Sequence, residues 1–92
     1  MRKEKLLVLY TMEGCHWCDK FKQMLKSKKI KFKDRDIDKH RDEYDLFVEN
    51  TQNDMVPAFM IIDIMSEKTN LYAPDRDYQD LDEAIKIIKE NF

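Results

Sequence analysis

Residues 6–18 have the sequence LLVLYTMEGCHWC, in which an apolar run leads through a short loop to two cysteines. The five apolar residues 6–10 predict a buried strand, because short continuous apolar runs are typical of strands that are covered on both faces. After the first cysteine, apolar side chains recur at helical spacing and predict a helix from residue 17 to about residue 28. The loop therefore joins a strand to a helix, and Cys15 is expected at the start of that helix.

Cys15 and Cys18 are the only cysteines of the chain. At the start of a helix, residues with this spacing have Cα atoms within the roughly 4.4–6.8 Å that a disulfide spans. Such a bridge closes too small a loop to constrain an unfolded chain much, which favours a reversible redox couple over a structural crosslink. Half of a metal site is the alternative, but two cysteines fall short of the usual four ligands. The order strand, Cys-x-x-Cys, helix is itself typical of redox motifs, and we predict no metal site.

The composition predicts one domain, residues 1–92, with a modest core. Hydrophobic residues make up 42% and charged residues 39%, which is typical of a globular protein. The net charge of −2 argues against nucleic-acid binding. No apolar run approaches the ~20 residues of a membrane span, and the first apolar run is too short for a signal peptide. We therefore expect a cytoplasmic protein that neither spans a membrane nor binds nucleic acid, in a compartment where disulfides tend to be catalytic.

The rest of the chain predicts, in order, a half-exposed strand over residues 30–37, a helix over 39–50, a polar turn over 51–54, and strands over 56–62 and 69–72. A last helix is expected to bury Leu81, Ala84, Ile85, Ile88 and Phe92, with Asp77 or Asp80 as its N-cap. The order βαβαββα describes an α/β fold with a central four-stranded mixed sheet flanked by helices. Its first two strands are expected to be parallel, and its last two to form a hairpin.

Three features of the chain together resemble the glutaredoxin family of the thioredoxin-like superfamily. They are the segment 9–18 with its Cys-His-Trp-Cys motif, the segment Met55-Val56-Pro57, which is similar to the family's Thr-Val-Pro, and the βαβαββα order. The resemblance covers nearly the whole chain and implies a thioredoxin-like (glutaredoxin) fold. It implies further that the bond between Val56 and Pro57 is cis and faces the cysteines. In this family an extended substrate peptide pairs with the backbone of the residue before that proline, here Val56.

The chain departs from the family where many members bind glutathione. Met12 and Asp54 stand where many glutaredoxins carry basic residues, and residues 72–77 replace a Gly-Gly-Asp segment. Those family features bind the carboxylates and the backbone of glutathione, and an acidic Asp54 would repel a carboxylate. Glutathione is therefore expected to be a poor cosubstrate, unless Arg76 substitutes as a carboxylate clamp.

The expected site follows from the motif and the resemblance. Cys15 is the predicted nucleophile, because a helix N-terminus and the Cys-x-x-Cys motif stabilise a thiolate. Cys18 is predicted to resolve the mixed disulfide. His16, if protonated, would favour the Cys15 thiolate; otherwise it is a solvated loop residue. Trp17 either offers an apolar face to a partner or packs on the core. The predicted substrate-binding residues are Tyr10, His16, Trp17, Val56, Pro57, Asp75 and Arg76.

The leading functional hypothesis is a glutaredoxin-like dithiol–disulfide oxidoreductase that reduces disulfides in proteins or mixed disulfides with glutathione. An electron donor to ribonucleotide reductase is a specific version of this hypothesis. The alternatives are a thioredoxin-like donor that thioredoxin reductase recharges, and an iron–sulfur cluster carrier. The carrier alternative requires a glutathione site. The expected partners are disulfide-containing proteins and a glutathione or thioredoxin reductase system, and we expect a monomer without a bound cofactor.

Overall fold

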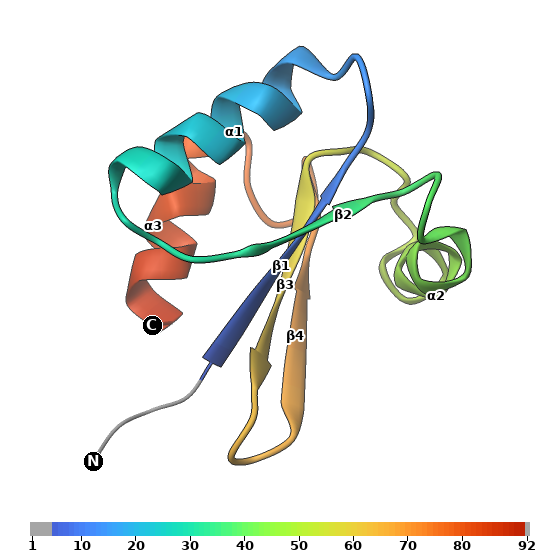
Figure 1. The fold of residues 1–92 in the computed structure, drawn as a ribbon. Helices are drawn as coiled ribbons and strands as arrows, with labels where there is room; N and C mark the ends of the chain where they lie inside the picture. The colour runs from blue at the N-terminus through green and yellow to red at the C-terminus, as the bar shows by residue number, and fades with distance from the viewer. Residues whose placement is uncertain (1–4, 92) are drawn as a thin grey trace.

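The computed structural model describes residues 5–91, and its elements follow the predicted order βαβαββα (Figure 1). The elements are β1 (Lys5–Thr11), α1 (His16–Ser27), β2 (Lys33–Asp36), α2 (Arg41–Thr51), β3 (Ala58–Asp63), β4 (Lys68–Tyr72) and α3 (Leu81–Asn91). Each predicted helix and strand is present, with ends that differ by a few residues.

The four strands form one mixed sheet with the order β2-β1-β3-β4. Strands β1 and β2 are parallel, whereas β3 is antiparallel to both β1 and β4, so the predicted βαβ unit and the predicted hairpin are confirmed. The pairing of β1 with β3 ends where Tyr10 faces Ala58. Because β1 ends and β3 begins at this point, the loop before α1 and the loop before β3 meet at the same end of the sheet.

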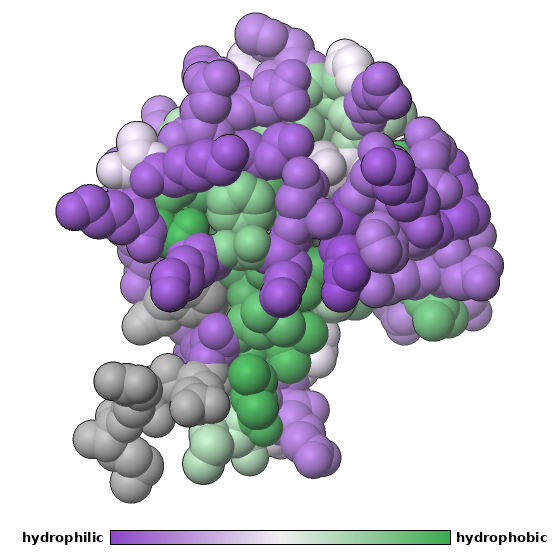
Figure 2. All heavy atoms as spheres, viewed as in Figure 1, coloured by the Kyte–Doolittle hydropathy of each residue, from purple (hydrophilic) through white to green (hydrophobic). Residues whose placement is uncertain are grey.

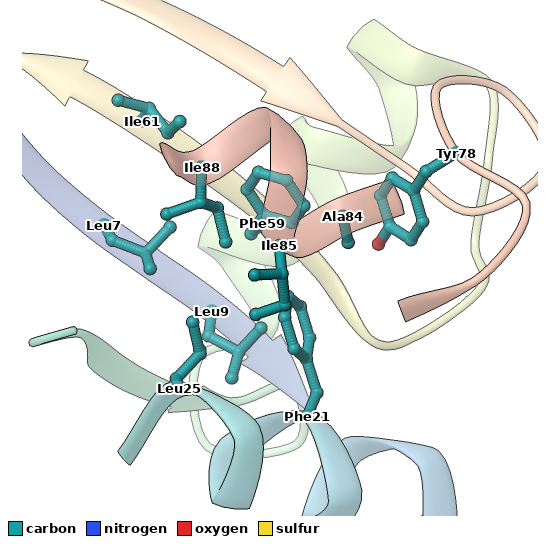
Figure 3. Packing of buried hydrophobic residues seen from close by; sticks show 10 residues of the cluster. All are labelled: Leu7, Leu9, Phe21, Leu25, Phe59, Ile61, Tyr78, Ala84, Ile85 and Ile88. Carbon is teal, nitrogen blue, oxygen red and sulfur yellow. The ribbon is translucent and has the colours of Figure 1, made fainter. Parts of the chain in front are cut away.

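Helices α1 and α3 cover one face of the sheet, and α2 lies on the other (Figure 1). Successive side chains of a strand point to opposite faces, and β1 contributes to both cores. Leu7 and Leu9 lie in the core under α1 and α3, whereas Val8 and Tyr10 lie in the core under α2. Figure 3 shows the larger core, in which side chains of α1 and α3 meet those of β1 and β3. The central strand is therefore buried on both faces, as its continuous apolar run predicts.

The three helices are short, and α3 has the clearest start signal. The Asp80 carboxylate accepts a hydrogen bond from the N–H of Glu83 at 2.8 Å, and the Glu83 carboxylate accepts one from the N–H of Gln79 at 3.2 Å. This arrangement resembles a capping box, except that the Glu83 carboxylate bonds to the residue before the N-cap and not to the N-cap itself. Asp80 is thus the N-cap, and the alternative, Asp77, instead accepts a hydrogen bond from the N–H of Ala73. Among residues 5–91, no helix is both long enough and apolar enough to cross a membrane.

Two strands are shorter than predicted. Strand β2 begins at Lys33 and not at Ile30, because the N–H of Ile30 still donates to the Leu25 carbonyl at the end of α1. Strand β3 begins after Pro57, which has no N–H to give to a ladder.

The core of α3 also differs slightly from the expectation. Ala84, Ile85 and Ile88 are buried as predicted, whereas Leu81 is only partly buried. Phe92, the last residue of the predicted apolar set, lies outside the described residues.

The buried position of Leu9 generates a stability prediction. Leu9 is fully buried between α1, α3 and β3, so Leu9→Ala should lower the free energy of unfolding by about 2–5 kcal/mol. Leu46→Ala is the control, because Leu46 on α2 is 61% exposed, and it should change this free energy by less than about 0.5 kcal/mol. Urea unfolding followed by circular dichroism measures both. Equal losses in the two variants would contradict the assigned core.

Candidate active site

Cys15 and Cys18 are joined by a disulfide, and their Cα atoms lie 5.2 Å apart. Cys15 is the N-cap residue of α1 and is partly exposed, whereas Cys18 is completely buried one turn into the helix. A partner can therefore approach the sulfur of Cys15, while the sulfur of Cys18 is shielded. Within the part of the chain that the structure describes, no three His, Cys, Asp or Glu side chains are grouped to hold a metal ion.

The start of α1 is arranged to stabilise negative charge on Cys15. The backbone N–H of Cys18 donates a hydrogen bond to the Cys15 sulfur at 3.1 Å. The sulfur thus occupies the place that a serine or aspartate oxygen usually takes in an N-cap. When the pair is reduced, this donor and the positive end of the helix dipole both favour the thiolate form of Cys15.

Gly14 lets the chain turn into this helix. Its φ of +79° lies in the left-handed region that glycine adopts without steric cost. A Cβ at this position would meet nothing within 4 Å, so the glycine is required by its backbone conformation and not by crowding. The turn is closed by a hydrogen bond from the N–H of Cys15 to the Met12 carbonyl.

The segment before β3 forms the second part of the site. The peptide bond between Val56 and Pro57 is cis, which confirms the expectation from the family resemblance. Both residues line a groove of about 220 Å³, and Trp17 at the start of α1 lines the same groove. Most of the residues that line it are apolar, and the exposed carboxylates Asp75 and Asp80 line it as well. The structure therefore brings together four predicted substrate-binding residues: Trp17, Val56, Pro57 and Asp75.

Two residues that the sequence analysis did not single out tie the walls of this groove together. The Asn53 side chain donates a hydrogen bond to the Pro74 carbonyl at 2.6 Å and accepts one from the N–H of Met55. The buried hydroxyl of Tyr78 donates to the Pro57 carbonyl. Burial, together with the nearby Asp77 carboxylate, raises the pKa of Tyr78, so its hydroxyl keeps the proton that it donates.

The loop that replaces the family's diglycine is closed by its own hydrogen bonds. The N–H of Asp75 donates to the Tyr78 carbonyl at 2.8 Å, and the N–H of Asp77 donates to the Ala73 carbonyl at 2.9 Å. Asp75 has a φ of +66°, and aspartate adopts this left-handed region more often than most residues other than glycine. The loop thus makes its turn without glycine, and these two N–H groups are already paired within it.

Three predicted substrate-binding residues do not line the groove: Tyr10, His16 and Arg76. Arg76 donates hydrogen bonds to the Asp77 carboxylate at 2.8 Å and to the Leu71 carbonyl at 3.3 Å, and it does not line the groove. Tyr10 is buried in the core under α2, where its ring packs 4.9 Å from that of Phe47. Burial raises the pKa of Tyr10. The Asp77 carboxylate thus holds the Arg76 guanidinium, and the strand directs the Tyr10 ring to the face under α2.

His16 and Trp17 lie on the exposed side of the first helical turn. The Trp17 side chain is 56% exposed, which contradicts the alternative that it packs on the core. The Lys20 ammonium lies 5.2 Å from the centre of the Trp17 ring, a distance at which a cation–π interaction forms. His16 is also exposed, and its ring lies 5.8 Å from that of Trp17. Together these residues give the surface beside Cys15 an aromatic face.

Comparison with known proteins gives a family and a fold. The model of the family described as glutaredoxin matches residues 7–63, which is more than half of the chain. The chain belongs to the glutaredoxin family. The matched region includes both cysteines and the cis proline, and it ends before the loop that replaces the diglycine.

A solved structure described as that of a malarial protein is similar over 94% of both chains, with a TM-score of 0.56 and 13% sequence identity. At this identity the likeness supports the thioredoxin-like fold alone. No curated protein matches the chain.

The hydrogen bond between Tyr78 and Pro57 generates a second stability prediction. Tyr78→Phe leaves a buried carbonyl without its donor, so it should lower the free energy of unfolding by about 1–3 kcal/mol. Tyr72→Phe is a matched control, because the Tyr72 ring stacks on Phe59 as the Tyr78 ring does, and its hydroxyl donates to no described residue. That control should stay within about 0.5 kcal/mol of the unsubstituted protein in urea unfolding. If both variants lose equally, the hydroxyl does not stabilise the groove.

Proposed function

We propose that this glutaredoxin is a dithiol–disulfide oxidoreductase that reduces disulfides in other proteins. The observation that carries the proposal is the contrast between its two cysteines: the Cys15 sulfur is accessible at a helix N-terminus, and the Cys18 sulfur is completely buried behind it. A two-step exchange needs this asymmetry, because the Cys15 thiolate must reach the substrate, whereas the Cys18 thiolate must reach only the Cys15 sulfur.

The proposed reaction transfers two electrons from the cysteine pair to the substrate disulfide. The Cys15 thiolate attacks one sulfur of that disulfide, and the other sulfur leaves as a thiolate that takes up a proton. The Cys18 thiol then loses its proton and attacks the Cys15 sulfur, which releases the second substrate thiolate. The protein is left with the disulfide between Cys15 and Cys18, and the substrate is left with two thiols.

The groove beside Trp17, Val56 and Pro57 is the proposed binding place of the peptide around the substrate disulfide. An extended peptide there would pair with the backbone of Val56, which lies just outside the sheet ladder. Its apolar side chains would contact the groove floor. The class of substrate that fits is a protein with an accessible, reducible disulfide, and a reductive enzyme such as ribonucleotide reductase is one member. We propose a reducing cytoplasm as the compartment of this reaction, because disulfides there are usually transient and catalytic.

The charges around the groove favour a reductant other than glutathione. Asp75 and Asp80 line the groove, no lysine or arginine does, and Asp54 is exposed just before the cis proline. Glutathione carries two carboxylates and one ammonium group, so its net charge is negative and these side chains repel it overall. Arg76 is paired with Asp77, and two loop N–H groups are paired internally. We therefore propose, as the second candidate function, a thioredoxin-like electron donor whose disulfide between Cys15 and Cys18 is reduced by thioredoxin reductase.

The two-step exchange is tested by trapping its intermediate. Cys18→Ser should accumulate a mixed disulfide between Cys15 and a peptide or protein substrate, because the resolving thiol is lost while the attacking thiol remains. Cys15→Ser is the matched control and should form none, because the remaining thiol is buried. Mass spectrometry of the intact adducts, without added reductant, distinguishes them. Normal turnover of protein disulfides by Cys18→Ser would rule out the resolving role.

The reductant is tested by following NADPH loss with the oxidised protein. We expect faster reduction by thioredoxin reductase than by glutathione with glutathione reductase. Asp54→Lys should raise the rate with glutathione severalfold, since a charge at the rim acts mainly on association. Asp45→Lys makes the same charge change on the exposed side of α2 and should leave the rate unchanged. Rapid reduction of the unsubstituted protein by glutathione would contradict the proposed repulsion.

A further inference from the structure

A dense group of lysines lies at the end of the molecule away from the cysteines. Residues 26–33 have the sequence KSKKIKFK, with five lysines in eight residues and no acidic residue, in a chain whose net charge is −2. The segment runs from the last turn of α1 to the first residue of β2. All five lysines are exposed, so the positive charge is concentrated on one surface, which we call the lysine face.

The lysine face surrounds a groove of about 780 Å³. Lys26, Lys29, Lys31 and Lys33 line it, and Ile30 and Phe32 form part of its apolar floor. Both apolar side chains are half-buried, because they pack against the core under α1 and α3. Figure 2 shows hydrophilic side chains projecting around a small hydrophobic surface on this side of the molecule.

The lysines of the lysine face form no ion pair with the rest of the described chain. The ion pairs among residues 5–91 use Lys22, Arg35, Arg41 and Arg76, and none uses a lysine of residues 26–33. Neighbouring like charges repel one another within the Debye length, which is about 8 Å at physiological ionic strength. Such a surface produces a field that draws anionic partners toward it.

We propose that this groove docks an acidic, partly apolar segment of a partner protein. Carboxylates of such a segment would pair with the rim lysines, while its apolar side chains would enter the groove and contact the floor. A lipid surface fits less well, because insertion needs protruding apolar side chains, and Ile30 and Phe32 are recessed. Single-stranded nucleic acid fits less well too, because its bases stack on open aromatic rings, and Phe32 is half-buried.

The docking groove and the cysteines lie at opposite ends of α1. The helix has 12 residues, so the two ends are about 18 Å apart at 1.5 Å per residue. A partner held by its acidic segment would therefore leave Cys15 accessible. Tethering a disulfide close to Cys15 would also raise its effective concentration there. This consequence rests on the proposed redox function, whereas the docking itself does not.

The test is binding of a cysteine-free, fluorescein-labelled peptide made of Glu, Asp, Leu and Phe, followed by fluorescence anisotropy. We expect saturable binding that weakens as salt is added. The double variant Lys29→Glu/Lys31→Glu should weaken it roughly tenfold, because two rim attractions become repulsions. The control variant Lys39→Glu/Lys68→Glu makes the same change in net charge on exposed lysines that do not line the groove. It should bind the peptide as the unsubstituted protein does.

Three outcomes would overturn the proposal. The peptide does not bind, or both double variants weaken its binding equally. In the third, a single-stranded DNA or an anionic phosphatidylserine vesicle binds as tightly as the peptide, and Lys29→Glu/Lys31→Glu abolishes that binding too. Should that variant fail to fold, Lys29→Gln/Lys31→Gln removes the same charges without adding any. Reduction of a short neutral peptide disulfide should be unchanged in every variant. If the unsubstituted protein does not reduce this peptide disulfide, the redox proposal is rejected, whereas the docking result is unaffected.

Discussion

The antiparallel pairing of β1 with β3 is the constraint on which the site depends. Its register places Tyr10 opposite Ala58, so β1 ends beside the start of β3. The loop that follows β1 carries Cys15, and the loop that precedes β3 carries Val56 and the cis Pro57. A slip of this register by one residue would reverse the faces of the strand and move Leu7 and Leu9 out of their core. Burial of β1 on both faces therefore fixes the core and the active site together.

The connection from β1 to α1 could be predicted because its sequence signals are local. A continuous apolar run, a glycine in the loop and helical spacing after Cys15 each act within a few residues. The polar contacts that close the groove could not be predicted in this way. Asn53 bonds to Pro74, and Tyr78 bonds to Pro57, each across 21 positions. Neither pair has a periodic signal, since its partners are far apart in the sequence and are brought together by the β3–β4 hairpin.

The same limit explains the position of Arg76, but not that of Tyr10. Arg76 has the charge of a carboxylate clamp, but the sequence does not show that the adjacent Asp77 takes its guanidinium and is itself held by the N–H of Ala73. Tyr10 stands at the end of the active-site strand, and strand alternation alone sends its ring to the face under α2. For Arg76 the direction of the side chain is set by tertiary contacts, whereas for Tyr10 it follows from strand alternation, a signal that the sequence itself carries.

The charge distribution separates two tasks along α1. At its N-terminal end, carboxylates border the groove beside the accessible cysteine. Arg76 does not line this groove, because it is paired with Asp77. At its C-terminal end, five lysines gather without acidic partners among the described residues. An acidic segment would be repelled by the first end and attracted by the second. A partner that carries both an acidic segment and a disulfide would therefore approach in one orientation, with the segment directed away from Cys15. Glutathione has no such second attachment, so for it only the repulsion at the cysteine end applies.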